Sequence, residues 1–253
     1  MRLLLSNDDG IYSPFLPIFA KALSARAEVE IVVPACEQSW IGRAYNRHAD
    51  IEVRKVDFHG FTCHTVSGTP SDCVNIALSH LYADNPPDAV VSGLNIGQNV
   101  ALPLLWSSGT FAAAVEAAGW GFPSFACSMR LLKKFYEQCR IRHESAPAEL
   151  LEYLTDASEH AAEYIAETLS GGKAEAGVIK NINYPADFRK GTPFKKCVPA
   201  RAKLASLYVK NADGTYTFSY AMGDTLPSGN GLPTDVECLA AGWACVSEVP
   251  IHG

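Results

Sequence analysis

Two neighbouring carboxylates near the start of the chain are its most reactive feature. Asp8 and Asp9 follow the apolar residues 3–5 and precede Gly10. An apolar run that ends in polar residues predicts a buried strand whose carboxyl end opens into a polar site. Adjacent carboxylates are costly to bury unless a cation neutralises them, and Gly10 lets the chain leave strand geometry so that both can face one ion. An ordinary Asp-Asp-Gly turn is the alternative interpretation.

Further polar residues stand where other predicted strands end or helices begin: Ser39, Asn95, Asn99, Ser108, Gly109 and Thr110. The metal donors among them are hydroxyl or amide oxygens, and together with the two carboxylates they favour a hard ion such as Mg²⁺ or Mn²⁺ over Zn²⁺. Residues 108–110 open an alanine-rich helix, where free N–H groups suit a phosphate, although many such starts are only helix caps. The combined pattern predicts metal-assisted transfer of a phosphoryl group to water.

The order of the predicted elements indicates an α/β fold. An apolar strand, a helix beginning at Ser13-Pro14 and a second strand at 28–33 form a β-α-β unit, which implies a Rossmann-like, mostly parallel sheet flanked by helices. The Gly-x-Gly-x-x-Gly fingerprint of dinucleotide sites is absent. A hairpin is expected at 50–66, a helix capped by Thr69, and a long helix at 145–169.

The pattern changes after residue 185. We expect residues 1–185 to form the catalytic domain that binds metal and phosphate. Residues 186–253 lack alternating helices, and the turn residues at 211–214 indicate a hairpin. They predict a β-rich C-terminal appendage that acts as an oligomerisation arm. Thr234 and Asp235 are expected to cap a short helix before a last strand.

Composition narrows the function further. The net charge of -6 and the lack of a basic block argue against a nucleic-acid polymer or a membrane surface as partner. The eight cysteines include no Cys-x-x-Cys pair, so we expect reduced core residues of an intracellular protein and neither a disulfide framework nor a zinc site. With no apolar signal segment at the N-terminus, a cytoplasmic location is expected.

Six motifs occur in the same order as in a known family, and through them the sequence resembles the SurE family of survival-protein nucleotidases. The motifs are Leu5-Ser6-Asn7-Asp8-Asp9-Gly10-Ile11, Gln38-Ser39, Ser67-Gly68-Thr69-Pro70-Ser71-Asp72-Cys73-Val74, Val91-Ser92-Gly93-Leu94-Asn95-Ile96-Gly97-Gln98-Asn99, Ser108-Gly109-Thr110 and Asn181-Ile182-Asn183-Tyr184-Pro185. The resemblance implies one divalent metal ion per subunit, held by Asp8, Asp9, Ser39 and Asn95.

It also implies hydrolysis of nucleoside monophosphates, by a 5′-nucleotidase that could also act on 3′-nucleotides and polyphosphate. Asp8, Asp9 and Asn95 would be catalytic, and Asn99, Ser108, Gly109 and Thr110 would bind the phosphate. Family members are typically dimers or tetramers that exchange a C-terminal β-hairpin, so a homodimer or homotetramer is expected.

The sequence is also compatible with two other functions, and it departs from the family pattern at several positions. Asp8 could be a covalent nucleophile, as in aspartyl-phosphate phosphatases, although their Asp-x-Asp spacing is missing. The chain could also bind nucleotides with a metal and not turn them over. Trp40 replaces a small residue of the family, where it could narrow the pocket or stack on a base, and Phe111-Ala112 replaces the family's Val-Gly.

Overall fold

A nine-stranded sheet forms the centre of the chain in the computed structural model, which describes residues 1–136, 138–139, 146–229 and 231–251. The strands of this sheet, in spatial order, are β3 (Val53–Phe58), β4 (Phe61–Val66), β2 (Glu28–Pro34), β1 (Arg2–Ser6), β5 (Ala89–Ile96), β6 (Ser124–Met129), β7 (Val178–Tyr184), β13 (Ala244–Pro250) and β8 (Phe194–Cys197). The strands from β4 to β7 in this order are parallel, whereas β3 runs antiparallel to β4 and β13 antiparallel to β7. The predicted mostly parallel sheet is therefore confirmed.

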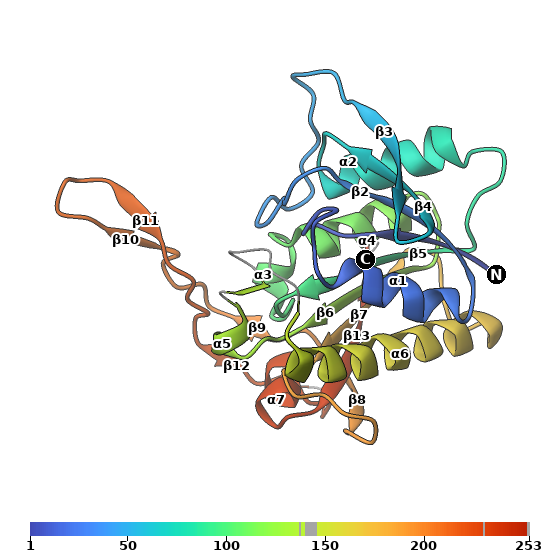
Figure 1. The fold of residues 1–253 in the computed structure, drawn as a ribbon. Helices are drawn as coiled ribbons and strands as arrows, with labels where there is room; N and C mark the ends of the chain where they lie inside the picture. The colour runs from blue at the N-terminus through green and yellow to red at the C-terminus, as the bar shows by residue number, and fades with distance from the viewer. Residues whose placement is uncertain (137, 140–145, 230, 252–253) are drawn as a thin grey trace.

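Helices cover both faces of the sheet (Figure 1). One face packs against α1 (Leu16–Ser24) and α6 (Ala148–Ser170), and the other against α2 (Pro70–Ile76) and α4 (Gly109–Gly119). Leu3 and Leu5 of β1 belong to the first core cluster and Leu4 to the second, because side chains alternate across a strand. Burial on both faces explains why this strand is continuously apolar.

The chain order places the polar loops at one edge of the sheet. Strand β1 lies between β2 and β5: the chain first builds outward to β2 and then returns to continue on the other side with β5. In an open parallel sheet, the carboxyl ends of the strands at such a reversal leave a crevice where ligands bind. The loops after β1, β2 and β5 meet there.

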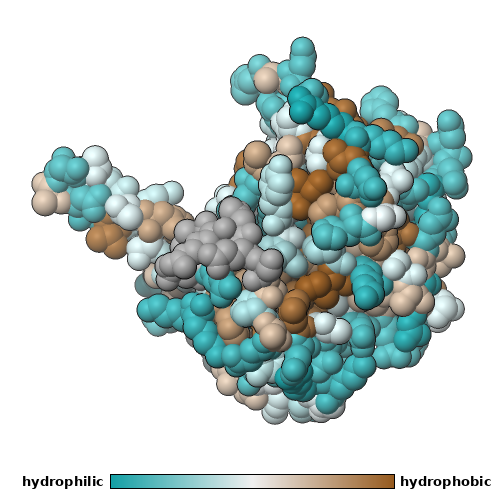
Figure 2. All heavy atoms as spheres, in the orientation of Figure 1, coloured by the Kyte–Doolittle hydropathy of each residue, from teal (hydrophilic) through white to brown (hydrophobic). Residues whose placement is uncertain are grey.

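The C-terminal region contributes to the sheet and also extends away from it. Strands β8 and β13 lie in the main sheet, and α7 (Asp235–Ala240) connects to β13. Between β8 and α7 the chain forms β9 (Arg201–Ala202) paired with β12 (Thr225–Leu226), and the hairpin of β10 (Tyr208–Lys210) and β11 (Tyr216–Phe218). The hairpin projects from the body (Figure 1) and carries hydrophobic as well as hydrophilic side chains (Figure 2). We call residues 199–233 the arm.

Most local predictions agree with the structure. The 50–66 hairpin is present as β3 and β4, and Thr69 and Thr234 each form a capping box at the start of a helix. Helix α2 continues into a π-helical turn, η1 (Ala77–Leu81), and α3 (Leu102–Leu105) and α5 (Lys133–Tyr136) are single turns. The first residue of the predicted 145–169 helix lies outside the described residues, and the helix is observed from Ala148.

The predicted start of the first helix is wrong. Ser13 does not cap it: residues 11–15 form turns, and the Ser13 hydroxyl accepts a hydrogen bond from the N–H of Phe15 at 3.4 Å. Helix α1 begins at Leu16 and places Pro17 in its first turn, where proline is as well tolerated as Pro14 would be. Among the described residues, no helix has both the length and the apolar character needed to cross a membrane.

Candidate active site

The loop after β1 is a tight turn that carries Asp8 and Asp9 and places Asp8 at the pocket. The Asn7 side chain closes the turn, because its Oδ1 accepts the N–H of Gly10 at 3.1 Å and its Nδ2 donates to the carbonyl of Gly10 at 3.0 Å. Gly10 has a φ of +79°, and a Cβ there would lie 3.0 Å from the carbonyl carbon of Cys36. Glycine is therefore required both by the backbone conformation and by the close approach of the loop that follows β2.

Asp8 lies against the first turn of α4. The hydroxyl of Thr110 donates to Asp8 Oδ1 at 2.6 Å, and a Cβ on Gly109 would stand only 2.7 Å from the Cβ of Asp8. The positive end of a helix dipole stabilises a carboxylate placed there. Asp8 is only 5% exposed, so this helix start is what makes its charge tolerable at such burial.

Asp9 is held by the end of β5. Its Oδ2 accepts the N–H of Ile96 at 3.0 Å, and the side chain is 4% exposed. Asn95, the preceding residue, donates its Nδ2 to the carbonyl of Gly97 at 3.2 Å. That bond fixes the orientation of the amide and leaves the Asn95 oxygen as the atom suited to bind a cation.

Ser39 reaches the same place from the loop after β2. The N–H of Gln38 donates to the backbone carbonyl of Asp8 at 2.8 Å, which ties this loop to the loop after β1. Ser39, Asp8 and Asn95 line one pocket of about 500 Å³. The structure thus brings three of the four predicted metal ligands to one pocket, and Asp9 adjoins them in the chain.

The pocket also contains residues that sequence reasoning did not assign to a site. Arg130, Leu131 and Tyr136 follow β6, and Phe218 and Tyr220 come from the arm. Trp40 contacts both arm residues, with ring centroids 5.0 Å from Phe218 and 5.8 Å from Tyr220. Arg130 could have been found, because it follows the carboxyl end of a parallel strand. Nothing in the sequence pairs Phe218 or Tyr220 with Trp40.

The predicted phosphate-binding residues already have partners within the protein. Ser108 caps α4 by accepting the N–H of Phe111 at 3.0 Å, and it lines the pocket as Asn99 does. The Nδ2 of Asn99 donates to the Ser128 hydroxyl at 2.9 Å. Thr110 is completely buried against Asp8. Ser108 and Asn99 therefore face the space that a substrate would occupy, whereas Thr110 orients a carboxylate.

The backbone at Asn99 is fixed by strand β7. Asn181 and Asn183 both donate their side-chain Nδ2 to the Asn99 carbonyl, at 3.0 and 2.8 Å, and Asn183 Oδ1 accepts the N–H of Asn99 at 2.9 Å. The sequence motif 181–185 thus acts on the pocket indirectly, by holding the loop after β5.

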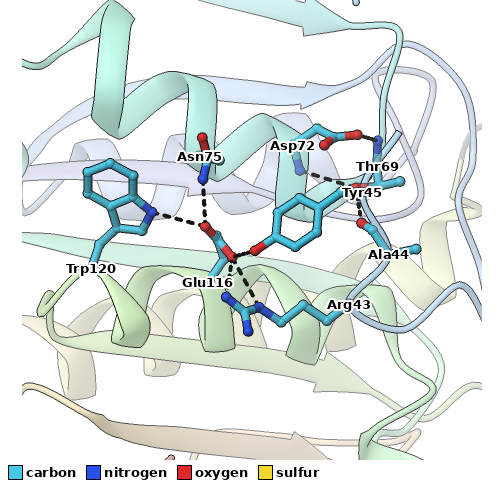
Figure 3. Close-up of polar contacts among 8 residues, drawn as sticks. All are labelled: Arg43, Ala44, Tyr45, Thr69, Asp72, Asn75, Glu116 and Trp120. Atoms are coloured by element: carbon cyan, nitrogen blue, oxygen red, sulfur yellow. Dashed lines mark hydrogen bonds and ion pairs between the residues drawn. The ribbon is translucent and has the colours of Figure 1, made fainter. Parts of the chain in front are cut away.

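A buried carboxylate, Glu116 of α4, anchors the loop that carries Ser39 and Trp40 (Figure 3). It receives hydrogen bonds from Arg43 Nη2 at 2.7 Å and from the Tyr45 hydroxyl, both in that loop. Asn75 and Trp120 donate to its other oxygen, each at 2.9 Å. Burial alone would raise the pKa of Glu116, but these bonds outweigh it and lower the pKa; burial and the bond to Glu116 raise the pKa of Tyr45 to about 12.

The same loop is attached to α2 by its capping box. The hydroxyl of Thr69 donates to the carbonyl of Ala44 at 2.7 Å (Figure 3). Asp72 Oδ2 accepts the N–H of Asn46 at 3.1 Å. Thr69 and Asp72, which belong to the sequence motif 67–74, therefore position a loop of the pocket but do not line the pocket themselves.

The donor set fits a hard divalent ion. Asp8, Asn95 and Ser39 bring a carboxylate, an amide and a hydroxyl oxygen to the pocket from the ends of β1, β5 and β2, and the buried carboxylate of Asp9 follows Asp8 in the chain. Mg²⁺ and Mn²⁺ prefer such ligands, and two negative charges at this burial are stabilised by a cation.

Known proteins resemble this chain in sequence and in fold. The profile of the family described as "Survival protein SurE" matches residues 3–206, which is most of the chain. The chain belongs to the SurE family. The resemblance expected from the six motifs is thereby confirmed.

Individual SurE proteins are similar over nearly the whole length. The chain is 36% identical to 5′-nucleotidase SurE of Nitratidesulfovibrio vulgaris over 246 residues, which cover 96% of this chain and 84% of that protein. It is 32% identical to 5′-nucleotidase SurE of Maridesulfovibrio salexigens, covering 100% of this chain and 93% of the relative. The crystal structure of the SurE protein from Aquifex aeolicus superposes with a TM-score of 0.74 at 22% identity, covering 99% and 93% of the two chains, and shows that the fold is shared.

The contact between Gly109 and Asp8 gives a first prediction. Gly109→Ala would place a Cβ 2.7 Å from the Asp8 Cβ and 3.0 Å from the carbonyl of Gln38, so Asp8 or the loop must move. We expect the free energy of unfolding to fall by about 1–3 kcal/mol, measured by urea denaturation. Gly119→Ala, at the other end of α4, is the control: its Cβ would meet nothing closer than 3.8 Å, and stability should stay the same or rise. Equal effects of the two variants would contradict the proposed contact.

The Glu116 network gives a second prediction. Glu116→Gln retains the shape of the side chain but leaves Arg43 without its charged partner, so unfolding should become easier by about 1–3 kcal/mol. Backbone hydrogen exchange of residues 41–46 should increase at the same time, because the loop loses its anchor. Glu163→Gln is the matched control, since its ion pair with Arg26 is half exposed and should contribute less than about 0.5 kcal/mol. Unchanged exchange in the Glu116 variant would show that the loop is held by other contacts.

Proposed function

We propose that this SurE protein is a metal-dependent 5′-nucleotidase, which hydrolyses nucleoside monophosphates to nucleoside and phosphate. The observation that carries the proposal is the pocket in which Asp8, Ser39 and Asn95 meet an aromatic wall. The oxygen ligands suit a metal and a phosphate, and the rings suit a nucleoside base. The relatives named 5′-nucleotidase SurE support the same activity.

One divalent ion per subunit, Mg²⁺ or Mn²⁺, would be held by Asp8, Asp9, Ser39 and Asn95. When bound, such an ion supplies Lewis acidity toward the phosphate and lowers the pKa of water. The protein's own groups position the reactants: Ser108 and Asn99 line the space beside Asp8, at the start of α4, where a helix N-terminus favours an anion. Arg130 lines the same pocket and adds positive charge that would stabilise the phosphoryl group as its charge shifts.

The nucleoside would lie against Trp40, Phe218 and Tyr220. Stacking on aromatic rings contributes about 1–3 kcal/mol per base and tolerates different bases. Trp40 has a φ of +59°, a conformation that is uncommon outside glycine, and its ring faces the two arm residues. Of the two roles considered for Trp40, we propose the stacking surface, and its place in the pocket lining supports it.

The arm supports a homodimer or homotetramer. Its exposed side chains include Leu204, Tyr208, Val209, Tyr216 and Leu226, which are 47–63% exposed in the isolated subunit. A two-stranded hairpin is marginally stable alone, and contiguous apolar exposure marks an interaction surface. A second copy of the chain is the partner we propose. The cysteines of the described residues form no disulfide, in keeping with the cytoplasmic location that we propose.

The metal-dependent activity gives the third prediction. Phosphate release from a panel of 5′- and 3′-nucleotides and polyphosphate should be absent in EDTA and appear with Mn²⁺ or Mg²⁺.

Asp9→Asn should lower kcat/KM by about 100-fold or more and leave the fold intact, because it removes one metal ligand and its charge. Asp57→Asn, an exposed residue of β3, should have no effect. Nucleotide binding without turnover for every metal would select the sensor, and an acid-stable phosphoenzyme on Asp8 would select the covalent mechanism.

The arm gives the fourth prediction. Replacing Tyr208 and Tyr216 together by Ser removes exposed rings outside the pocket, so light scattering should show a shift from the oligomer toward the monomer. Leu151→Ser, a comparably exposed apolar residue on α6, should leave the molecular mass unchanged. A wild-type protein that is monomeric at micromolar concentration would refute the proposed assembly.

A further inference from the structure

Three cysteines from separate segments meet at the base of the arm. Cys197 ends β8, Cys238 lies in α7 and Cys245 lies in β13, and all three are buried. Their sulfur atoms lie within 4.8 Å of one another. The register between β8 and β13 pairs Cys197 with Ser247, so Cys197 and Cys245 are diagonal neighbours on one face of the sheet, which α7 covers with Cys238. The spacing of the cysteines along the chain does not indicate this convergence.

The sulfur positions suit a thiophilic ion. An ion with metal–sulfur bonds of about 2.3 Å in tetrahedral geometry holds its sulfur ligands roughly 3.8 Å apart. Small shifts of the side chains would therefore bring the three sulfurs, now within 4.8 Å, to bonding distance. Thiolates select Zn²⁺, Cd²⁺ or Cu⁺ over Mg²⁺ and Mn²⁺, so this cluster and the oxygen site would bind different ions.

We propose that Cys197, Cys238 and Cys245 form a second metal site, which binds one thiophilic ion through three thiolates. Binding replaces three S–H bonds by three metal–sulfur bonds and releases three protons to solvent, with no change of oxidation state. The proposal does not depend on the nucleotidase activity, because the ligands and the ion differ from those of the pocket.

The place of the cluster gives the ion a structural role. Cys197 lies two residues before the arm, and Cys238 lies in the first helix after it. The two ends already touch, since the N–H of Val198 donates to the carbonyl of Pro233 at 3.1 Å and the N–H of Asp235 to that of Val198 at 2.9 Å. An ion would link both ends of the arm to β13. It would thereby fix the position of the arm, which carries Phe218 and Tyr220 to the pocket.

Helix α7 also connects the cluster to the pocket. The Asp235 carboxylate accepts the N–H of Ala200 at 2.9 Å and the N–H of Ala101 at 3.0 Å, and Ala101 is two residues beyond Asn99. An ion that fixes α7 therefore fixes the start of the arm and the loop after β5 together.

Cadmium is the probe that tests the proposal, since its bonds to thiolate give an ultraviolet charge-transfer band that oxygen ligands do not give. The reduced full-length protein is titrated anaerobically with Cd²⁺, both folded and during refolding, because the ligands are buried. We expect a band that saturates at one equivalent and a rise in the thermal unfolding midpoint. Cys197→Ala, Cys238→Ala and Cys245→Ala should each abolish or strongly reduce the band, whereas Cys63→Ala, a buried cysteine of β4, should retain it.

Asp9→Asn separates the two metal sites. This variant should keep the full cadmium band even though it loses the oxygen site, so a failure of the nucleotidase proposal would leave this result unchanged. The absence of a sulfur–cadmium band in both folded and refolded wild-type protein would overturn the second site. A band of undiminished intensity in any correctly folded variant of the three cysteines would also overturn it.

Discussion

The placement of two adjacent carboxylates at the end of a buried strand is the constraint on which the rest of the site depends. Asp8 and Asp9 repel each other and have lost most of their hydration. Each is therefore held by a different element: Asp8 by the first turn of α4 and Asp9 by the N–H of Ile96. The reversal of strand order around β1 brings those two elements to the same edge of the sheet. The charge pair therefore depends on this topology for its supporting contacts.

Helix α4 connects the two sides of the site. Its N-terminus supports Asp8, and Glu116, two turns later, binds Arg43 and Tyr45 of the loop that carries Ser39. The alanines between them let the helix pack closely between the sheet and α2 with almost no exposed surface. A buried charge such as Glu116 is tolerated because four side chains donate to it, and removing Arg43 would leave the carboxylate without its cationic partner.

The sequence predicted the parts of this structure that local patterns determine. Strand ends, capping residues and the hairpin at 50–66 follow from periodicity and turn chemistry, which is why Asp8, Asp9, Ser39 and Asn95 could be named. The start of α1 was misjudged because two prolines compete for the first helical turn. The roles of Glu116, Phe218, Tyr220 and the three cysteines depend on contacts between distant segments, and a single sequence carries no record of those contacts.

The arm shows why distant contacts matter most where a segment has no core of its own. Strands β10, β11 and β12 are exposed throughout, so they bury too little apolar surface to offset the entropy lost on ordering. Their order must come from outside: from Trp40, which packs on Phe218 and Tyr220, and from the base, where Asp235 binds the N–H of Ala200. The proposed second copy of the chain and the proposed thiolate-bound ion would add to it. Because the aromatic wall of the pocket is carried by this arm, whatever fixes the arm also shapes the place where a nucleoside would bind.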